Sequence, residues 1–274
     1  MSAAVKLSSP ATREFWEIPV LFEDEHLFAL DKPAGLLTSP DRLAPERPSL
    51  LNLLHAGIEA GKPWARERNL AYLANAHRLD FETSGVLLLA KNKPALVALA
   101  DLFGSERTVR NYVALVQGVP PDESFVVDQK IAPHPLKSSL MRIDSRTGKK
   151  ARTEFVVLER FSRWSLVRCL LRLERAQQIP LHASHAGFPV VGAETHGGKK
   201  LWLSRLKRDF HLKPGREERP LISRAALHAE ELNLAHPVTN EPLSIKSDWP
   251  KDLRVAVKYL RQYGKGEAGF LQRE

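Results

Sequence analysis

Short strand-like segments follow one another in adjacent pairs along this chain, and that order limits the folds it can adopt. Residues 86–90 form a continuous apolar run, which is typical of a strand buried on both faces. Other strand-like segments are spread along the chain, within residues 19–35 (two), 110–117, 153–159, 165–174, 227–234 and 243–246. Because these segments are not separated by regular helices, the sequence predicts an α+β fold with a mostly antiparallel sheet.

Helical patterns are fewer. Residues 48–60 and 93–107 repeat apolar side chains at helical spacing, and a third pattern covers residues 250–262. Residues 181–186, followed by Gly187, predict a short helix with Pro180 in its first turn.

The length of 274 residues is enough for one large domain with its own core. The apolar share of 43% and the charged share of 27% exclude a disordered or fibrous chain. We expect a loose arm at residues 1–17, one catalytic domain at 18–262 and a flexible tail at 263–274.

Charge and cysteine content limit the partners and the kinds of site that this chain can have. Lys and Arg number 41 against 32 Asp and Glu, a net charge of +9, which favours a polyanionic partner such as RNA. A single cysteine excludes a disulfide framework and a cysteine-based zinc site. With no apolar leader and no membrane-length apolar run, we expect a cytoplasmic protein that contacts no membrane.

The segment His77–Gly85, HRLDFETSG, places a charged Arg-x-Asp pair directly before the buried strand. Thr83, Ser84 and Gly85 can form a tight turn whose hydroxyls and amides orient Asp80. Taken alone, these residues favour a structural turn with an Asx-type cap.

HRLDFETSGVLLLAKN resembles the HRLDxxTSG signature of pseudouridine synthases of the RluA class. Further segments resemble that class in the same order, from about residue 18 to 255: FEDEHLFALDKPAGLLTSP, RNYVALVQG, SRTGKKARTEFVVLERF and RAALHAEELNLAHPVTNEPLSIKSDWPKDL. The resemblance implies the pseudouridine synthase fold and an isomerase that converts uridine to pseudouridine in rRNA or tRNA. It implies no cofactor, no metal and no obligate protein partner.

The resemblance also implies roles for individual residues. Asp80 matches the catalytic carboxylate, which acts on a uridine flipped out of the RNA. Arg78 matches the arginine that displaces and holds the RNA, and Tyr112 the aromatic that stacks on the flipped base. Lys32, in the Lys-Pro-x-Gly turn, is a further substrate-binding candidate. For Tyr112 the strand pattern also allows a core-facing side chain.

Two segments depart from the family. Where the family has Gly-Arg-x-His-Gln-Ile-Arg-x-His, residues 174–182 read ERAQQIPLH, so Pro180 replaces the arginine that pairs with the catalytic aspartate. Ala193 and His196 replace the Asp and Tyr of the family's Gly-Asp-x-x-Tyr-Gly. A buried carboxylate without a cationic neighbour is shifted toward its neutral form, which is a poor nucleophile.

Arg175 is a candidate for the missing cation. If the strand at 165–174 continued, alternation would place Arg175 on the same face as apolar Cys169 and Leu171. A charge on that face needs a partner, so we hypothesise that Arg175 reaches Asp80. The alternative is that the strand ends earlier and Arg175 lies in solvent.

Three histidines raise the question of a metal. His182 and His185 are three residues apart on the predicted helix, and His196 follows. Because His182 has a counterpart in a family that uses no metal, we expect none.

Two basic runs, residues 137–152 and 199–220, are the RNA-binding candidates, with solvated loops as the alternative. The second run also contains Trp202 and Phe210, which could stack on bases. The basic residues singled out are Lys149, Lys150, Arg152, Lys199, Lys200, Arg205, Lys207 and Arg208.

Three functional hypotheses follow. The first is an RNA pseudouridine synthase with Asp80 as its catalytic carboxylate. The second is an RNA-binding or RNA-folding factor whose pseudouridine synthase site has degraded. The third is a histidine-based metal hydrolase.

Overall fold

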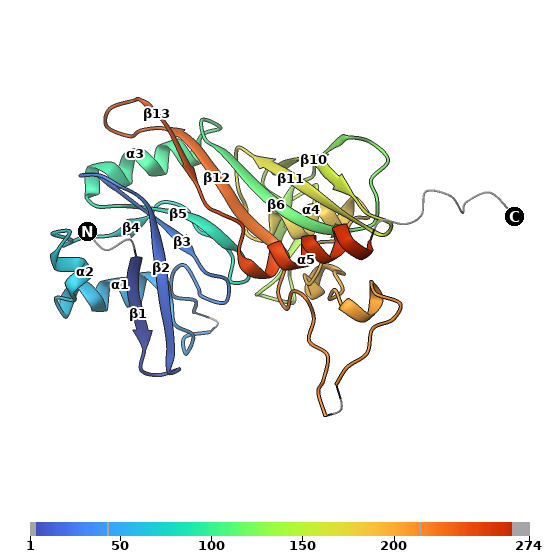
Figure 1. The fold of residues 1–274 in the computed structure, drawn as a ribbon. Helices are drawn as coiled ribbons and strands as arrows, with labels where there is room; N and C mark the ends of the chain where they lie inside the picture. The colour runs from blue at the N-terminus through green and yellow to red at the C-terminus, as the bar shows by residue number, and fades with distance from the viewer. Residues whose placement is uncertain (1–3, 43, 214, 265–274) are drawn as a thin grey trace, which may run out of the picture.

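The computed structural model describes residues 4–42, 44–213 and 215–264, which form one large mixed sheet with helices packed against it (Figure 1). Within these residues the sheet has eleven strands. Nine of them lie side by side in the order β1 (Ala4–Ser9), β2 (Glu14–Glu23), β3 (Leu27–Lys32), β5 (Ser84–Ala90), β12 (Leu227–Ala235), β6 (Val109–Gln117), β11 (Trp164–Leu171), β10 (Arg152–Arg160) and β7 (Ser124–Asp128). The other two, β4 (Ala74–Asn75) and β13 (Pro242–Lys246), pair with β5 and β12.

The remaining elements surround this sheet. A separate hairpin consists of β8 (Ile131–Pro133) and β9 (Met141–Ile143). The helices are α1 (Leu50–Glu59), α2 (Pro63–Arg66), α3 (Lys93–Gly104), α4 (Gln178–His185) and α5 (Lys251–Tyr263), with short 3-10 turns η1 (Glu194–His196) and η2 (Leu203–Arg205). All but one of the described strand pairings are antiparallel, so the predicted α+β fold is confirmed.

The exception is the parallel pairing of β5 with β12, which lies at the centre of the sheet. Gly85 makes this contact possible, because a Cβ there would lie 2.2 Å from the carbonyl oxygen of Ala229. Its φ of 115° is also one that side-chain-bearing residues rarely adopt. Beside it, the Ser84 hydroxyl is hydrogen-bonded to Nδ1 of His228 at 3.0 Å. The glycine of the HRLDFETSG segment therefore anchors that segment to the sheet.

The predicted loose arm at residues 1–17 is wrong for the part that the structure describes. Residues 4–9 form β1, which pairs with β2 from Ala4–Pro19 to Ser9–Glu14. Val5 and Leu7 are buried in the core and Lys6 is exposed, so the segment alternates as an edge strand should. The alternation is too short to be distinctive in the sequence. The predicted tail at 263–274 begins at the end of α5, and residues 265–274 lie outside the described part.

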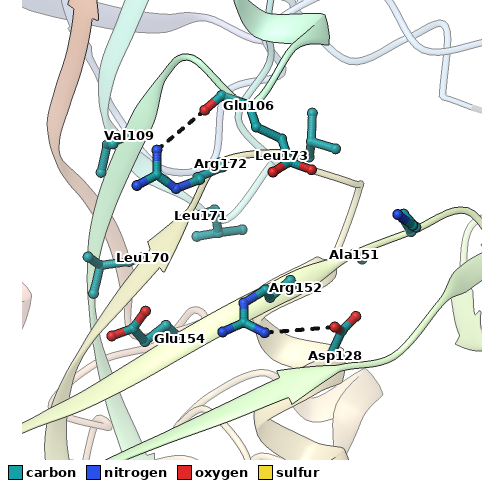
Figure 2. A pocket seen from close by; sticks show the side chains of 11 residues that line it. Glu106, Val109, Asp128, Ala151, Arg152, Glu154, Leu170, Leu171, Arg172 and Leu173 are labelled. Atoms are coloured by element: carbon teal, nitrogen blue, oxygen red, sulfur yellow. Dashed lines mark hydrogen bonds and ion pairs between the residues drawn. The ribbon is translucent and has the colours of Figure 1, made fainter.

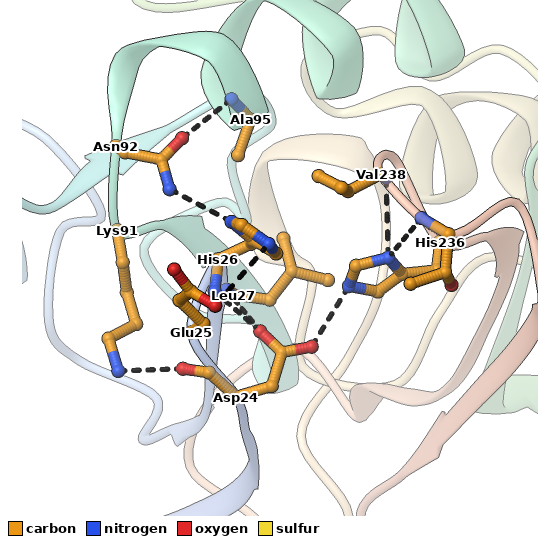
Figure 3. A network of polar contacts seen from close by, with 10 residues as sticks. Asp24, Glu25, His26, Leu27, Lys91, Asn92, Ala95, His236 and Val238 are labelled. Atoms are coloured by element: carbon orange, nitrogen blue, oxygen red, sulfur yellow. Dashed lines mark hydrogen bonds and ion pairs between the residues drawn. The ribbon is translucent and has the colours of Figure 1, made fainter.

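A polar network joins the β2–β3 turn to the β12–β13 turn (Figure 3). In the β2–β3 turn, the Asp24 carboxylate accepts the amides of His26 and Leu27, both at 2.7 Å. The same carboxylate lies 2.9 Å from Nε2 of His236, in the β12–β13 turn. The amide of Thr239 donates to Nδ1 of His236, so Nε2 carries the proton given to Asp24. Turns more than 200 residues apart are thereby joined.

In the part of the chain that the structure describes, no helix is both long and apolar enough to span a membrane.

Candidate active site

The loop that carries Asp80 is fixed by the segment after β3. Thr38 is buried, and its hydroxyl both donates to the carbonyl of Leu79 (2.8 Å) and accepts its amide (3.1 Å). On the other side of Asp80, the amide of Gly35 donates to the carbonyl of Phe81 at 2.8 Å. The backbone around the carboxylate is therefore held from both sides.

The carboxylate of Asp80 is oriented by the start of α4. Its Oδ2 accepts the backbone amide of Gln177 at 2.9 Å, and Gln177 is the N-cap residue of that helix. A helix N-terminus carries partial positive charge and favours an anion. The expected role of Thr83 and Ser84 is corrected: the Thr83 amide donates to the Asp80 carbonyl, and Ser84 bonds to His228. These two residues shape the turn, and Gln177 orients the carboxylate.

Gln177 has a left-handed backbone conformation, with φ of 56° and ψ of 20°. Its side chain donates to the carbonyl of Ser139 (2.7 Å) and accepts the amide of Met141 (3.1 Å). Gln177 thus links the Asp80 carboxylate, α4 and the β8–β9 hairpin. No sequence signal indicated this role, because glutamine is not a residue type favoured in left-handed turns.

Several polar and charged groups act on the Asp80 carboxyl, although Pro180 stands where the family pattern has an arginine. Burial raises the pKa of the Asp80 carboxyl, while the Gln177 amide and the charges of Arg78, Lys32 and His196 lower it, in that order of effect. Arg78 is exposed, so its side chain is accessible from outside the pocket. Among the described residues, Asp80 therefore has several weak partners rather than one ion pair.

Lys32 does not face a substrate. Its side chain is fully buried, and Nζ donates to the carbonyls of Pro33 (2.9 Å) and Leu36 (2.7 Å). Burial lowers the pKa of Lys32 to about 7, while the nearby Asp80 charge opposes that shift. The structure corrects the substrate-binding interpretation: Lys32 supports the turn and acts on Asp80 through its charge.

The hypothesis that Arg175 pairs with Asp80 is contradicted. Strand β11 ends at Leu171, so the alternation of the strand does not extend to Arg175. The Arg175 Nε donates instead to the carbonyl of Lys150 at 3.2 Å, and among the described residues Arg175 forms no ion pair with Asp80. The chain leaves the strand direction before it reaches the left-handed turn at Gln177.

Tyr112 is buried in β6, with only 2% of its surface exposed, as the core-facing alternative expects. Its hydroxyl donates to Oε1 of Glu174 at 2.5 Å. Arg110 places Nε 3.7 Å from Oε2 of the same carboxylate. Burial raises the pKa of Glu174 to about 7 and that of Tyr112 well above its usual value. The sequence analysis did not identify Glu174 as a site residue.

Asp80 lies where two pockets meet. The larger, about 350 Å³, is also lined by Arg78, Gln177, Pro180 and His196. The smaller, about 210 Å³, is lined by Asp80 and Arg78 together with Glu174 and Arg175. Pro180 also lines the larger pocket, so it borders the space beside Asp80.

The three histidines do not form a metal site. The ring of His182 is hydrogen-bonded at both nitrogens, to the Thr153 hydroxyl (2.9 Å) and to the Gln129 carbonyl (3.0 Å). His196 lines the larger Asp80 pocket, and its Nε2 is buried without a hydrogen-bond partner among the described residues. No group of three or more His, Cys, Asp or Glu side chains within the described ranges is placed to hold a metal.

The basic candidates fall into two exposed regions. Lys150 and Arg152 line a third pocket, of about 200 Å³ between strands of the sheet, where Arg152 lies 3.8 Å from Asp128 (Figure 2). Lys149 precedes them and is exposed. The second region is a loop that extends from η1 through η2 and projects away from the sheet (Figure 1). It carries Lys199, Lys200, Arg205, Lys207 and Arg208.

This fold, with an aspartate held in a pocket at the start of a helix, defines a class of protein. The human protein RNA Pseudouridylate Synthase Domain Containing 4 has the same fold, with a TM-score of 0.68 at 23% identity over 88% of this chain and 92% of that one. The family model for RNA pseudouridylate synthase matches residues 26–185. The chain therefore belongs to the RNA pseudouridine synthase family, and it is an isomerase of that family.

Two bacterial relatives are similar over most of this chain. Ribosomal large subunit pseudouridine synthase D of Xylella fastidiosa is 34% identical over 260 residues, which are 94% of this chain and 72% of the relative. Ribosomal large subunit pseudouridine synthase C of Salmonella typhi is 31% identical over 244 residues, 88% of this chain and 70% of the relative. The resemblance drawn from the sequence motifs is confirmed.

Proposed function

We propose that this protein converts uridine to pseudouridine in the RNA of the large ribosomal subunit, with Asp80 as the catalytic carboxylate. The observation that carries the proposal is the carboxylate of Asp80, oriented by the Gln177 amide in a pocket beside Arg78. The RNA class follows from the names of the relatives from Xylella fastidiosa and Salmonella typhi.

The reaction detaches uracil from ribose at N1, turns it and joins it again through C5. Asp80 must be ionised to act as nucleophile or as electrostatic partner. The Gln177 amide and the nearby charges of Arg78, Lys32 and His196 favour that form against the effect of burial. Arg78, exposed beside Asp80, is suited to hold the RNA from which the uridine is flipped.

The basic loop supports the choice of an RNA substrate. Lys199 follows closely after His196, which lines the Asp80 pocket, so the basic loop begins at the rim of the site. Lysine and arginine side chains on such a loop can contact phosphates on either side of a flipped nucleotide. The protein thus offers space for one base beside Asp80 and a charged surface for the neighbouring nucleotides.

The test is a map of pseudouridines in total RNA from cells that lack the gene and carry either wild type or Asp80→Ala. We expect one large-subunit rRNA site to be lost in Asp80→Ala and kept in Asp122→Ala, an exposed control. A site lost from tRNA instead would overturn the choice of RNA. Unchanged maps, with the wild-type protein expressed and bound to RNA, would favour the RNA-binding factor with a degraded site.

A further inference from the structure

We propose that Glu174 is a second catalytic carboxylate of this site, and that it accepts the proton which the uracil ring releases from C5. The inference rests on the proposed isomerisation at Asp80. It concerns a residue for which the family pattern has glycine.

Glu174 and Asp80 face the same space. Both line the smaller pocket, about 210 Å³, together with Arg78. The side chain of Glu174 is 21% exposed, so a base in this pocket could touch it. A uracil that enters this pocket beside Asp80 therefore borders a second carboxylate.

Glu174 is held in place from the side of the core. The Tyr112 hydroxyl donates to Oε1 at 2.5 Å, and Arg110 places Nε 3.7 Å from Oε2. Arg110 is fixed in turn, because Nη1 donates to the carbonyl of Arg172 at 2.9 Å. A carboxylate anchored in this way loses little freedom when it meets the substrate.

The overall reaction requires a proton acceptor. When C5 is joined to ribose, the C5–H bond breaks and its electron pair forms the C5=C6 double bond. The proton passes to a carboxylate oxygen of Glu174. N1, released from ribose, ends with one proton, which protonated Glu174 or water supplies. Atoms and electrons balance without an oxidant, a reductant or a cofactor.

The surroundings of Glu174 suit it to proton transfer at neutral pH. Burial raises the pKa of Glu174 to about 7; Arg110, Tyr112 and Arg78 oppose this shift, and the charge of Asp80 adds to it. A general base works best when its pKa is close to the working pH, because it must both accept and release the proton. The ionisable residues His77 and Arg175 line the same pocket.

The experiment uses the full chain and RNA labelled with tritium or deuterium at C5 of uridine. We expect Glu174→Gln to bind RNA normally but to release tritium roughly 100-fold more slowly, as for the loss of a general base. Deuterium at C5 should slow this variant further, because proton removal has become rate-limiting. The decline in wild-type rate below a pH of about 7 should also disappear in Glu174→Gln.

Matched variants separate this role from a structural one. Glu241→Gln, an exposed control, should behave as wild type, and Glu174→Asp should keep measurable activity with the acid decline. A Glu174→Gln variant with the wild-type rate overturns the proposal. So does a slow variant without an isotope effect and with the acid decline unchanged, since that pattern indicates a structural role. If wild type itself releases no tritium from any RNA, the proposed isomerase function fails instead.

Discussion

The backbone amide of Gln177 donates a 2.9 Å hydrogen bond to the carboxylate of Asp80, a residue 97 positions earlier in the chain. The amide points there because Gln177 is in the left-handed region at the start of α4. The geometry of the Asp80 carboxylate thus depends on one unusual backbone conformation.

Substitutions of Gln177 should separate its backbone from its side chain. Gln177→Gly keeps the amide and relaxes the φ of 56°, but it loses the bonds to Ser139 and Met141. Gln177→Val loses the same bonds and adds strain of about 1–2 kcal/mol. We expect urea denaturation to show Val less stable than Gly by that amount. Equal stability of the two variants would contradict a strained role for Gln177.

Lys32 should make stability depend on pH. Its pKa is about 7 when folded and 10.5 in its ordinary state, so between these values the unfolded chain binds more protons. Stability should therefore rise with pH across this window, by at most about 1.4 kcal/mol per pH unit. Urea denaturation from pH 6 to 10 should show this rise in wild type and in Lys258→Met, an exposed control. The rise of stability with pH should be absent in Lys32→Met. A rise of equal size in this variant would show that another group causes it.

Restoring the family arginine should change the pH range of the reaction. Pro180 lines the pocket of Asp80, so the side chain in Pro180→Arg can place a cation beside the carboxylate. A cation there lowers the pKa of Asp80, which burial raises, and keeps it ionised at lower pH. We expect this effect in the Glu174→Gln background, where the decline assigned to Glu174 is absent: tritium release by Pro180→Arg with Glu174→Gln should persist at lower pH than release by Glu174→Gln alone. Pro180→Ala serves as the neutral control and should show no such extension.

The basic loop should contribute to RNA affinity in a salt-dependent way. Neutralising cations that contact phosphate lowers the slope of log K against log salt by about 0.7–0.9 per contact. The loop variant changes Arg205, Lys207, Arg208 and Lys213 to glutamine. The matched control makes the same four changes to glutamine at exposed positions outside the loop, Lys6, Arg13, Lys62 and Arg66. Filter binding at several salt concentrations should show a shallower slope for the loop variant alone; equal slopes would leave the loop as a solvated segment.

Much of the architecture followed from local patterns in the chain. The apolar run at 86–90 predicted a buried strand. This run lies in β5, which is buried along its whole length because it occupies the centre of the sheet, where both of its faces are covered. Helices α1, α3 and α5 were visible because each repeats apolar residues at helical spacing. The first strand was missed, since only Val5 and Leu7 mark its buried face.

The sequence also singled out Asp80 and Arg78, because a long ordered series of motifs surrounds them. It could not tell which groups would act on the Asp80 carboxylate. The alternation of side chains along a strand suggested Arg175 as one of these groups. That hypothesis was wrong because β11 ends before Arg175. The alternation rule applies only within the strand, so it cannot place a residue that lies beyond the end of the strand.

The partners of Asp80 come from distant parts of the chain. Lys32 arrives from β3, Gln177 from the start of α4 and His196 from η1. Glu174 shares the site because the loop after β11 turns back toward Tyr112. Motifs in the chain point to a candidate reacting group, since its chemistry resides in one residue. The charge and orientation of that group depend on burial and on neighbours that only the folded chain brings together.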